Sequence, residues 1–207
     1  MGYKTAQEEF WAGEFGNKYI ERNKGREIFA NKVNIFATII KSTLRGDINS
    51  CLELGCNIGL NLKALSVLIP NLKATGIEIN KKAADECAKL QNVHVINDSI
   101  INFVGNEKYD LTFTSGVLIH INPEELENVY RTLYENSKKY ILINEYYNPT
   151  PVTIPNRGNT DRLFKRDFAG EFMKKYPDVK LVDYGFFYHG DKLSKADDST
   201  WFLMEKC

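Results

Sequence analysis

The chain of 207 residues is 43% hydrophobic and 26% charged, a composition typical of a globular protein with a well-filled core. Its 27 Lys and Arg residues balance its 27 Asp and Glu residues, so the formal net charge is zero. This balance argues against a dedicated nucleic-acid-binding protein, which usually carries an excess of basic residues.

The sequence contains no apolar run long enough to cross a bilayer, and its first residues lack the apolar segment of a signal peptide. The cysteines form neither a C-x-x-C pair nor a metal-ligand spacing. We therefore expect a cytoplasmic protein with free thiols, without a metal site or a membrane partner, present as a monomer or a homodimer.

The N-terminal region predicts helices. Trp11, Phe15 and Tyr19 recur every four residues, which places their rings on one face of a helix. We expect Gly13 and Gly16 to divide this segment into two short helices. A longer amphipathic helix is predicted from residue 25 to about residue 45, because apolar side chains recur there every three or four residues up to a glycine at position 46.

Strands and helices alternate after residue 46. The predicted strands cover residues 50–54, 73–79, 93–97, 109–114 and 140–146, and the predicted helices cover residues 58–69, 81–90, 123–136 and 166–175. Two final segments, residues 179–188 and 200–205, are expected to pair antiparallel. This order predicts a doubly wound, Rossmann-like α/β fold with a mostly parallel seven-stranded sheet, an antiparallel terminal hairpin and extra N-terminal helices.

The first predicted strand ends in a glycine turn, Glu53-Leu-Gly-Cys-Asn-Ile-Gly59. Glycine lets a ligand approach the backbone, and the free N–H groups of the following helical turn point toward it. The spacing does not fit the G-x-G-x-x-G fingerprint of dinucleotide-binding proteins, because Asn57 and Leu60 stand where the second and third glycines belong. We therefore predict a site for a small polar ligand other than NAD or FAD.

Polar or small residues also follow the next three predicted strands. Glu78 ends the second strand, 23 residues after Gly55, where an acid can accept both hydroxyls of a ribose. Asp98 and Ser99 follow the third strand, and residues 114–117 form a small-residue opening after the fourth. Because the carboxyl ends of parallel strands meet at one edge, these residues predict a nucleoside site there.

The E-x-G-x-x-x-G pattern of Glu53, Gly55 and Gly59, followed by Glu78, resembles motif I and the ribose acid of the class I S-adenosylmethionine (SAM) methyltransferases. The resemblance runs from Cys51 to the terminal hairpin. It implies one methyltransferase domain, residues 1–207, with a helical lid over 1–46 and a SAM-binding core over 47–207. It also implies that SAM is held by residues at the strand ends: Glu53, Gly55, Cys56, Asn57, Gly59, Glu78, Ile79, Asp98, Ser99, Ile100, Ser115, Gly116 and Val117. Asn57 is a departure, since many members carry glycine there.

The string from Phe10 to Asn23, together with Cys56–Gly59, is similar to methylases associated with pseudaminic acid (a nonulosonic acid) and surface polysaccharide pathways. We expect a lid in which Trp11, Tyr19 and Arg22 contact the cofactor, because aromatic faces attract a sulfonium cation. Ordinary packing of these rings is the alternative.

Methyl transfer needs an acceptor in line with the sulfonium, exclusion of water and, in some enzymes, a general base. His120 directly follows the opening after the fourth strand and is the candidate base, because histidine can accept a proton at neutral pH. Glu145 and Tyr146 end the fifth strand and are candidates for the reactive wall of the acceptor pocket. Packing roles for these side chains, with catalysis by proximity alone, stay open.

The end of the fifth strand and the loop after it hold the acceptor-binding candidates Tyr147, Asn148, Arg157, Arg162 and Arg166. Their cations suit a carboxylate or a phosphate on the acceptor. A solvated basic face is the alternative.

The N/D-P-P-Y/F signature of DNA and glutamine N-methyltransferases is absent after the fourth strand. We therefore predict a SAM-dependent methyltransferase that acts on a small polar acceptor, on oxygen rather than nitrogen. The acceptor is expected to be a sugar, a nonulosonate or a nucleotide-linked precursor of a surface polysaccharide. One alternative is a methyltransferase of a small amine or a phosphorylated amino-alcohol. The other is a non-catalytic SAM-binding partner protein.

Overall fold

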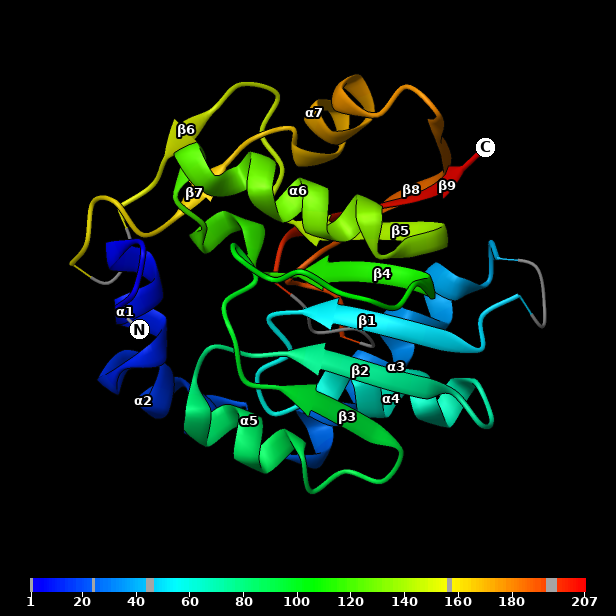
Figure 1. Ribbon diagram of the computed structural model, residues 1–207, viewed down its shortest axis with the longest axis horizontal. Helices are drawn as coiled ribbons and strands as arrows, with labels where there is room; N and C mark the ends of the chain where they lie inside the picture. Colours follow the sequence, from blue (N-terminus) through cyan, green and yellow to red (C-terminus); the bar gives the residue numbers. More distant parts are fainter. Residues whose placement is uncertain (1, 24, 44–46, 156–157, 193–196) are drawn as a thin grey trace.

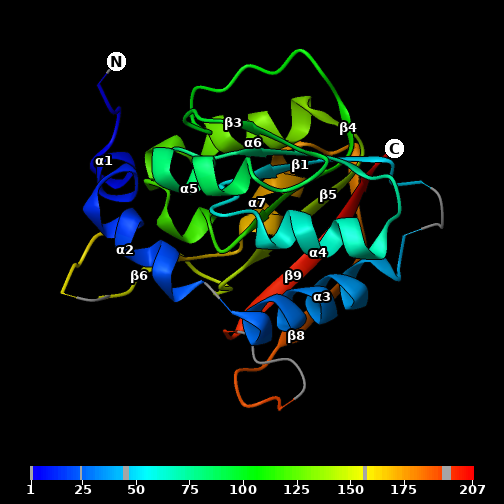
Figure 2. The same cartoon turned by 90° about the horizontal axis from the view of Figure 1, so that it is seen from below.

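The computed structural model describes residues 2–23, 25–43, 47–155, 158–192 and 197–207. A seven-stranded sheet runs through the middle of the molecule, with helices on both faces (Figure 1, Figure 2). Its strands are β1 (Ser50–Leu54), β2 (Lys73–Ile77), β3 (Val93–Ile96), β4 (Tyr109–Ser115), β5 (Ser137–Glu145), β8 (Val179–Phe187) and β9 (Ser199–Lys206). A separate two-stranded sheet consists of β6 (Val152–Thr153) and β7 (Phe164–Lys165).

The strand order β3-β2-β1-β4-β5-β9-β8 determines where a ligand can bind. The strands β1 to β5 are parallel, and β9 pairs antiparallel with both β5 and β8. The chain runs outward from β1 to β3 and then returns to β4 on the other side of β1, so the order reverses there. A ligand crevice is expected beyond the carboxyl ends of β1 and β4. The predicted doubly wound fold with its terminal antiparallel hairpin is confirmed.

Helices cover both faces of the sheet, and the first two helices lie beyond its carboxyl edge (Figure 1). The helices are α1 (Ala6–Ala12), α2 (Glu14–Arg22), α3 (Arg26–Ile40), α4 (Leu60–Leu68), α5 (Lys81–Cys87), α6 (Leu126–Glu135) and α7 (Phe168–Lys175), with the 3-10 turns η1 (Leu118–His120) and η2 (Pro123–Glu125). Side chains of β5 point alternately to the two layers: Tyr140 and Leu142 pack with α3 and α4, while Ile141 and Ile143 pack with α6 and α7. Among the described residues, none of the helices has the length and apolar character that a bilayer span requires.

Several elements differ from the predicted ones near turns. α4 begins at Leu60 rather than at residue 58, because Asn57 and Gly59 take left-handed backbone angles, with φ of 48° and 78°. The predicted helix over residues 123–136 starts with the 3-10 turn η2 before α6. Neither η1 nor the β6–β7 pair was predicted, because elements of two or three residues give no periodic signal.

The N-terminal helices α1 and α2 lie beyond the carboxyl ends of the central strands (Figure 1). α1 starts with a capping box between Thr5 and Glu8, and it ends at Gly13 as predicted. The expectation that Gly16 also interrupts the helix is wrong, since Gly16 lies inside α2. A side chain there would have its Cβ 1.9 Å from the Trp11 carbonyl oxygen and 2.7 Å from Asn80 Nδ2. Gly16 therefore permits a close approach of α2 to its neighbours.

The long helix α3 belongs to the helical layer on the sheet rather than to the segment beyond its edge. Phe36 and Ile39 of α3 are fully buried in the same cluster as Leu65 of α4. α3 ends at Ile40, and the predicted stop at position 46 lies outside the described residues.

We predict that Gly16→Ala displaces α2 without unfolding the sheet. The added methyl group would overlap the Trp11 carbonyl oxygen, which costs about 1–3 kcal/mol when a packed site is overfilled. Hydrogen exchange should become faster across residues 6–22 and stay unchanged in β1 and β4. Gly2→Ala is the control, because its new methyl group would meet no atom within 4 Å. Unchanged exchange over α1 and α2 in Gly16→Ala would contradict this view of the packing.

Candidate active site

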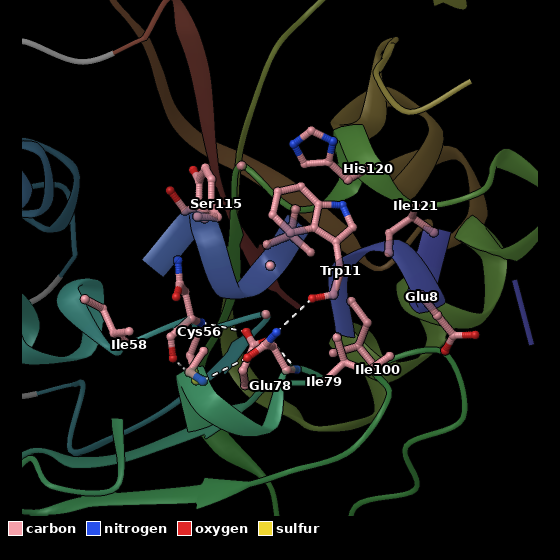
Figure 3. A pocket seen from close by; sticks show the side chains of 18 of the residues that line it. Glu8, Trp11, Cys56, Ile58, Glu78, Ile79, Ile100, Ser115, His120 and Ile121 are labelled. Atoms are coloured by element: carbon pink, nitrogen blue, oxygen red, sulfur yellow. Dashed lines mark hydrogen bonds between the residues drawn. The ribbon is translucent and has the colours of Figure 1, made fainter. Parts of the chain in front are cut away.

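A cavity lies at the carboxyl edge of the sheet, between the N-terminal helices and the turns that follow β1, β2, β3 and β4 (Figure 3). Its volume of about 160 Å³ far exceeds the ~10–15 Å³ that a single water needs. The strand ends singled out in the sequence meet here. Residues from each of them line the wall: Gly55, Cys56, Asn57, Glu78, Ile79, Ser99, Ile100, Ser115, Gly116 and Val117.

The Glu78 carboxylate joins two of these strand ends. It accepts hydrogen bonds from the backbone N–H of Asn57 and of Asn80, each at 2.7 Å, one on each oxygen. Burial raises the pKa of this carboxyl group, against the lowering effect of the backbone N–H groups. Each oxygen keeps further acceptor capacity toward the cavity, which a pair of ligand hydroxyls can use.

Asn80 connects the strand edge to the N-terminal helices. Its Oδ1 accepts from the Ala83 N–H at 3.0 Å and caps α5. Its Nδ2 lies 3.1 Å from the Trp11 carbonyl oxygen and 3.1 Å from Asn17 Oδ1. Asn80 therefore holds the α1–α2 junction over the cavity, a role that the sequence did not indicate.

Gly55 is required in the glycine turn by its backbone angle and by a close neighbour. Gly55 has a φ of 75°, and a Cβ at this position would lie 2.7 Å from a methyl group of Val117. Because Gly55 has no side chain, the turn after β1 can approach Val117, in the segment after β4. The N–H groups of Gly55 and Cys56 both donate to the Ile77 carbonyl oxygen, at 2.8 and 3.0 Å. The turn is thereby fixed to β2 as well.

One end of the cavity has apolar walls with a polar rim. Ile79, Ile100 and Ile101 supply apolar surface suited to a flat base. The Ser99 hydroxyl is hydrogen-bonded to the Glu8 carboxylate, whose other oxygen accepts from the Thr5 N–H at 3.0 Å. α1 thus closes this end by a polar contact.

Four of the expected cofactor residues are not among those that line the cavity: Glu53, Gly59, Asp98 and Arg22. Glu53 is fully buried beneath the turn, where burial raises the pKa of its carboxyl well above the usual value, and Asn61 Nδ2 donates to it at 2.6 Å. Gly59 caps α4, and Asp98 accepts from the Ser99 N–H at 2.7 Å. The Arg22 guanidinium lies 5.8 Å from the Phe15 ring centroid. These four residues therefore lie around the cavity and do not form part of its wall.

A second cavity of about 180 Å³ adjoins the first and shares Trp11, Tyr19 and His120 with it. Its remaining wall combines aromatic and apolar residues with polar side chains: Phe10, Phe15, Ile119, Tyr146, Asn159, Arg162, Leu163 and Asp197. Burial and a contact with Asp197 raise the pKa of the Tyr146 hydroxyl. The Trp11 and His120 rings lie side by side at the shared wall, with centroids 4.7 Å apart (Figure 3).

His120 is held in a defined tautomer. Its Nδ1 lies 2.7 Å from the Arg162 carbonyl oxygen, and because a carbonyl only accepts, Nδ1 carries the proton. Nε2 is then an acceptor when the ring is neutral. Burial lowers the pKa of the imidazole, which keeps it neutral at physiological pH. The geometry therefore supplies a base at the wall between the two cavities.

Glu145 lies beneath this wall and is not among the residues that line either cavity. Its carboxylate accepts from the N–H groups of Val117 and Ile119, at 3.0 and 3.5 Å. Burial raises its pKa to about 7 in spite of these contacts. Glu145 fixes the backbone that carries His120.

Of the expected acceptor-binding cations, the structure brings Arg162 to the second cavity. Arg166 instead pairs with Glu171, with Nε to oxygen at 2.7 Å. Asn148 donates to the Thr150 carbonyl oxygen, and the Tyr147 side chain is exposed and contacts Phe202. Arg157 lies outside the described residues.

Two charged residues on the wall of the first cavity were missed by the sequence analysis. Glu8 was not singled out, although its capping-box spacing from Thr5 could have drawn attention to it. Lys32 of α3 lines the first cavity, and its place on an amphipathic helix gave no signal. In the part of the chain that the structure describes, no group of three His, Cys, Asp or Glu side chains could hold a metal ion.

Comparisons with known proteins bear on the family and the fold. Residues 51–139 match the family model described as a methyltransferase domain. This match confirms the predicted methyltransferase for that segment of the chain. No curated protein sequence matches the chain. The resemblance to pseudaminic acid methylases stays a prediction.

Three solved structures with a similar fold are methyltransferases in complex with S-adenosylhomocysteine. The magnesium protoporphyrin IX methyltransferase of Synechocystis PCC 6803, with bound S-adenosylhomocysteine (SAH), is 12% identical over 97% of each chain, with a TM-score of 0.70. An O-methyltransferase of a Brevibacillus brevis polyketide synthase, with SAH, is 12% identical over 99% of this chain and 80% of its own, with a TM-score of 0.68. The plantazolicin methyltransferase BpumL, with SAH and a pentazolic desmethylPZN analogue, is 15% identical over 97% of this chain and 95% of its own, with a TM-score of 0.67. The chain therefore has the SAM-methyltransferase fold.

We predict that Glu145→Gln removes a pH-dependent loss of stability. The raised pKa means that the folded protein holds this proton between about pH 4.5 and 7, whereas the unfolded chain has released it. The protonated Glu145 carboxyl stabilises the folded protein at pH values below the pKa of the unfolded chain. This stabilisation is lost as the pH rises through the pKa of the folded state, by on the order of 3 kcal/mol. Relative to wild type, the free energy of unfolding of the variant should rise between pH 5 and pH 8 in urea titrations.

Glu124→Gln, at an exposed position, is the control and should give a difference that does not change with pH. If Glu145→Gln gives the same flat difference, its carboxyl group is not the titrating one.

Proposed function

We propose that this protein is a SAM-dependent methyltransferase that acts on the hydroxyl group of a small polar acceptor, with the cofactor in the first cavity and the acceptor in the second. The observation that carries the proposal is the Glu78 carboxylate on the cavity wall, fixed by two backbone N–H groups between the glycine turn and the apolar surface of Ile79 and Ile100. An acid between a glycine turn and an apolar slot suits a nucleoside without phosphate.

The residues of the first cavity fit the parts of SAM in order. Glu78 would accept the ribose hydroxyls, and Ile79 and Ile100 would pack on the adenine, with Ser99 at its edge. The turn of residues 55–59 and the backbone of residues 115–117 would border the amino-acid portion. α1 and α2, with Trp11 and Tyr19, would act as the lid that was expected from the N-terminal sequence.

SAM supplies an electrophilic methyl group on its sulfonium. The protein has to bring the acceptor oxygen in line with that methyl group and exclude water. The neutral His120 imidazole at the shared wall would accept the hydroxyl proton on Nε2, while the Arg162 carbonyl oxygen keeps Nδ1 protonated. Tyr146 would contact the acceptor from the other wall, and Glu145 would position the backbone of η1.

The mixed wall of the second cavity supports a polar ring as the acceptor. Aromatic rings offer flat apolar faces, and Asn159, Arg162 and Asp197 offer polar groups. A sugar or a nonulosonate combines these two demands, and Arg162 would bind its carboxylate. The same cation would suit the phosphate of an amino-alcohol, so that acceptor class is the second candidate. A SAM-binding partner without catalysis is the third.

We expect SAH to bind wild type and to bind Glu78→Gln about 10- to 150-fold more weakly in calorimetric titrations, because ribose hydrogen bonds to a charged acceptor contribute about 1.5–3 kcal/mol. Glu86→Gln, on the exposed side of α5, is the matched control and should bind like wild type. Absence of SAH binding to wild type would exclude the proposed cofactor and with it the methyltransferase function.

We expect transfer of a labelled methyl group from SAM to a member of an acceptor panel that contains sugars, nonulosonates, nucleotide-linked sugars and phosphorylated amino-alcohols. His120→Gln should lower kcat on that acceptor by about 10²–10⁴-fold, the usual effect of losing a general base, with SAH affinity changed only a few-fold. Because burial lowers the pKa of His120, the wild-type kcat should fall at a pH below the usual titration range of an imidazole, and the variant should lose this pH dependence.

His94→Gln, at an exposed position of β3, is the control for the histidine substitution. Unchanged kcat and pH profile in His120→Gln would leave proximity alone as the catalytic contribution of the site. SAH binding without transfer to any acceptor in the panel or in a cell extract would favour the non-catalytic partner.

A further inference from the structure

The strongest unexplained feature of the first cavity is a cation without a partner. Lys32, from the middle of α3, lines the cavity together with Asn57 and Asn61. Within the described residues, its ammonium group makes no hydrogen bond and no ion pair. Lys32 is half-buried, and an unpaired charge that is partly removed from water is stabilised by a counter-charge from a ligand.

Among the described residues, no carboxylate forms an ion pair with Lys32. The carboxyl groups that attract it electrostatically belong to Glu53 and Asp197. Burial raises the pKa of Glu53 well above its usual value, which favours the neutral carboxyl, and Asn61 already donates to it. Asp197 is exposed and contacts the Tyr146 hydroxyl. Burial also lowers the pKa of Lys32 itself, as expected for a charge that lacks a close partner.

Lys32 lies at a defined end of the cavity. The side chain interacts electrostatically with Glu53 at the end of β1. Glu53 in turn accepts a hydrogen bond from Asn61, in the first turn of α4. Ser99 and Ile100, which border the proposed base position, come from the far side of β2 in the strand order. The N-terminus of α4, with Leu60 and Asn61 on the cavity wall, adds the positive end of a helix dipole at the same place.

We propose that Lys32 binds the carboxylate of the amino-acid portion of the cofactor. The inference rests on the proposed function, because it assumes a ligand whose amino-acid end occupies this part of the cavity. Among the described residues that line the cavity, Lys32 is the one Lys or Arg side chain, whereas Glu8 and Glu78 are acidic. The cavity therefore places one cation where the ligand would carry its one anion. Lys32 would thereby distinguish SAM from nucleosides that lack a carboxylate.

The test compares two ligands by calorimetric titration: SAH, and its decarboxylated analogue, which keeps the adenosine, the thioether and the amine. Lys32→Met keeps the length of the side chain and removes its charge. We expect this variant to bind SAH about 10- to 100-fold more weakly than wild type does, and to bind the decarboxylated analogue within about three-fold of wild type. Lys32→Arg should retain most of the SAH affinity. Lys82→Met, on the exposed face of α5, is the control for a lost charge.

If Lys32→Met lowers the affinity for both ligands equally, the inference is overturned. Such a result would show that Lys32 shapes the cavity without binding the carboxylate. Unchanged SAH binding would also overturn it. If wild type binds neither ligand, the proposed function fails as well. If wild type binds both and the variant does not discriminate between them, only the role of Lys32 fails.

Discussion

The site depends on one buried carboxylate with two backbone donors. Glu78 ties the N–H of Asn57, in the turn after β1, to the N–H of Asn80, in the turn after β2. These turns belong to neighbouring strands, and their separation is set by the sheet. A buried carboxylate is tolerated only with such donors, and a cavity bordered by its free acceptor positions favours ligands with hydroxyl groups. The same interaction therefore positions the glycine turn and, under the proposed function, would bind the ribose hydroxyls.

Glu145 is a second buried acid, and it fixes the backbone on the other side of the point where the strand order reverses. Glu145, at the end of β5, accepts from Val117 and Ile119 and so fixes the segment between β4 and η2. Val117 in turn packs where Gly55 has no side chain. The two halves of the site meet through this contact, and each half is stiffened by an acid from the neighbouring strand. The arrangement explains why both acids are buried although only Glu78 reaches the cavity wall.

The predicted residues that do line the cavity are those whose position follows from the backbone. Gly55, Glu78 and Ser99 stand at strand ends, and a parallel sheet brings its strand ends together whatever the side chains do. Glu53, Asp98 and Arg166 also stand near strand ends, but short-range partners turn them away from the wall: Asn61, the Ser99 N–H and Glu171. Lys32 was not predictable, because its position depends on how α3 packs against α4, more than twenty residues further along the chain. Periodicity locates a helix face and does not show what that face meets.

The two cavities are coupled through their common wall. Trp11 and Tyr19 come from α1 and α2, whereas His120 comes from η1, so the wall exists only while the N-terminal helices lie against the sheet edge. Asn80 holds the junction of those helices through the carbonyl oxygen of Trp11 itself. Its own backbone N–H is bonded to Glu78, the proposed ribose acceptor. The hydrogen bonds from Glu78 through Asn80 to Trp11 therefore connect the wall of the first cavity to that of the second. Under the proposed function, the contacts that hold the nucleoside side of the first cavity in place would also complete the acceptor site.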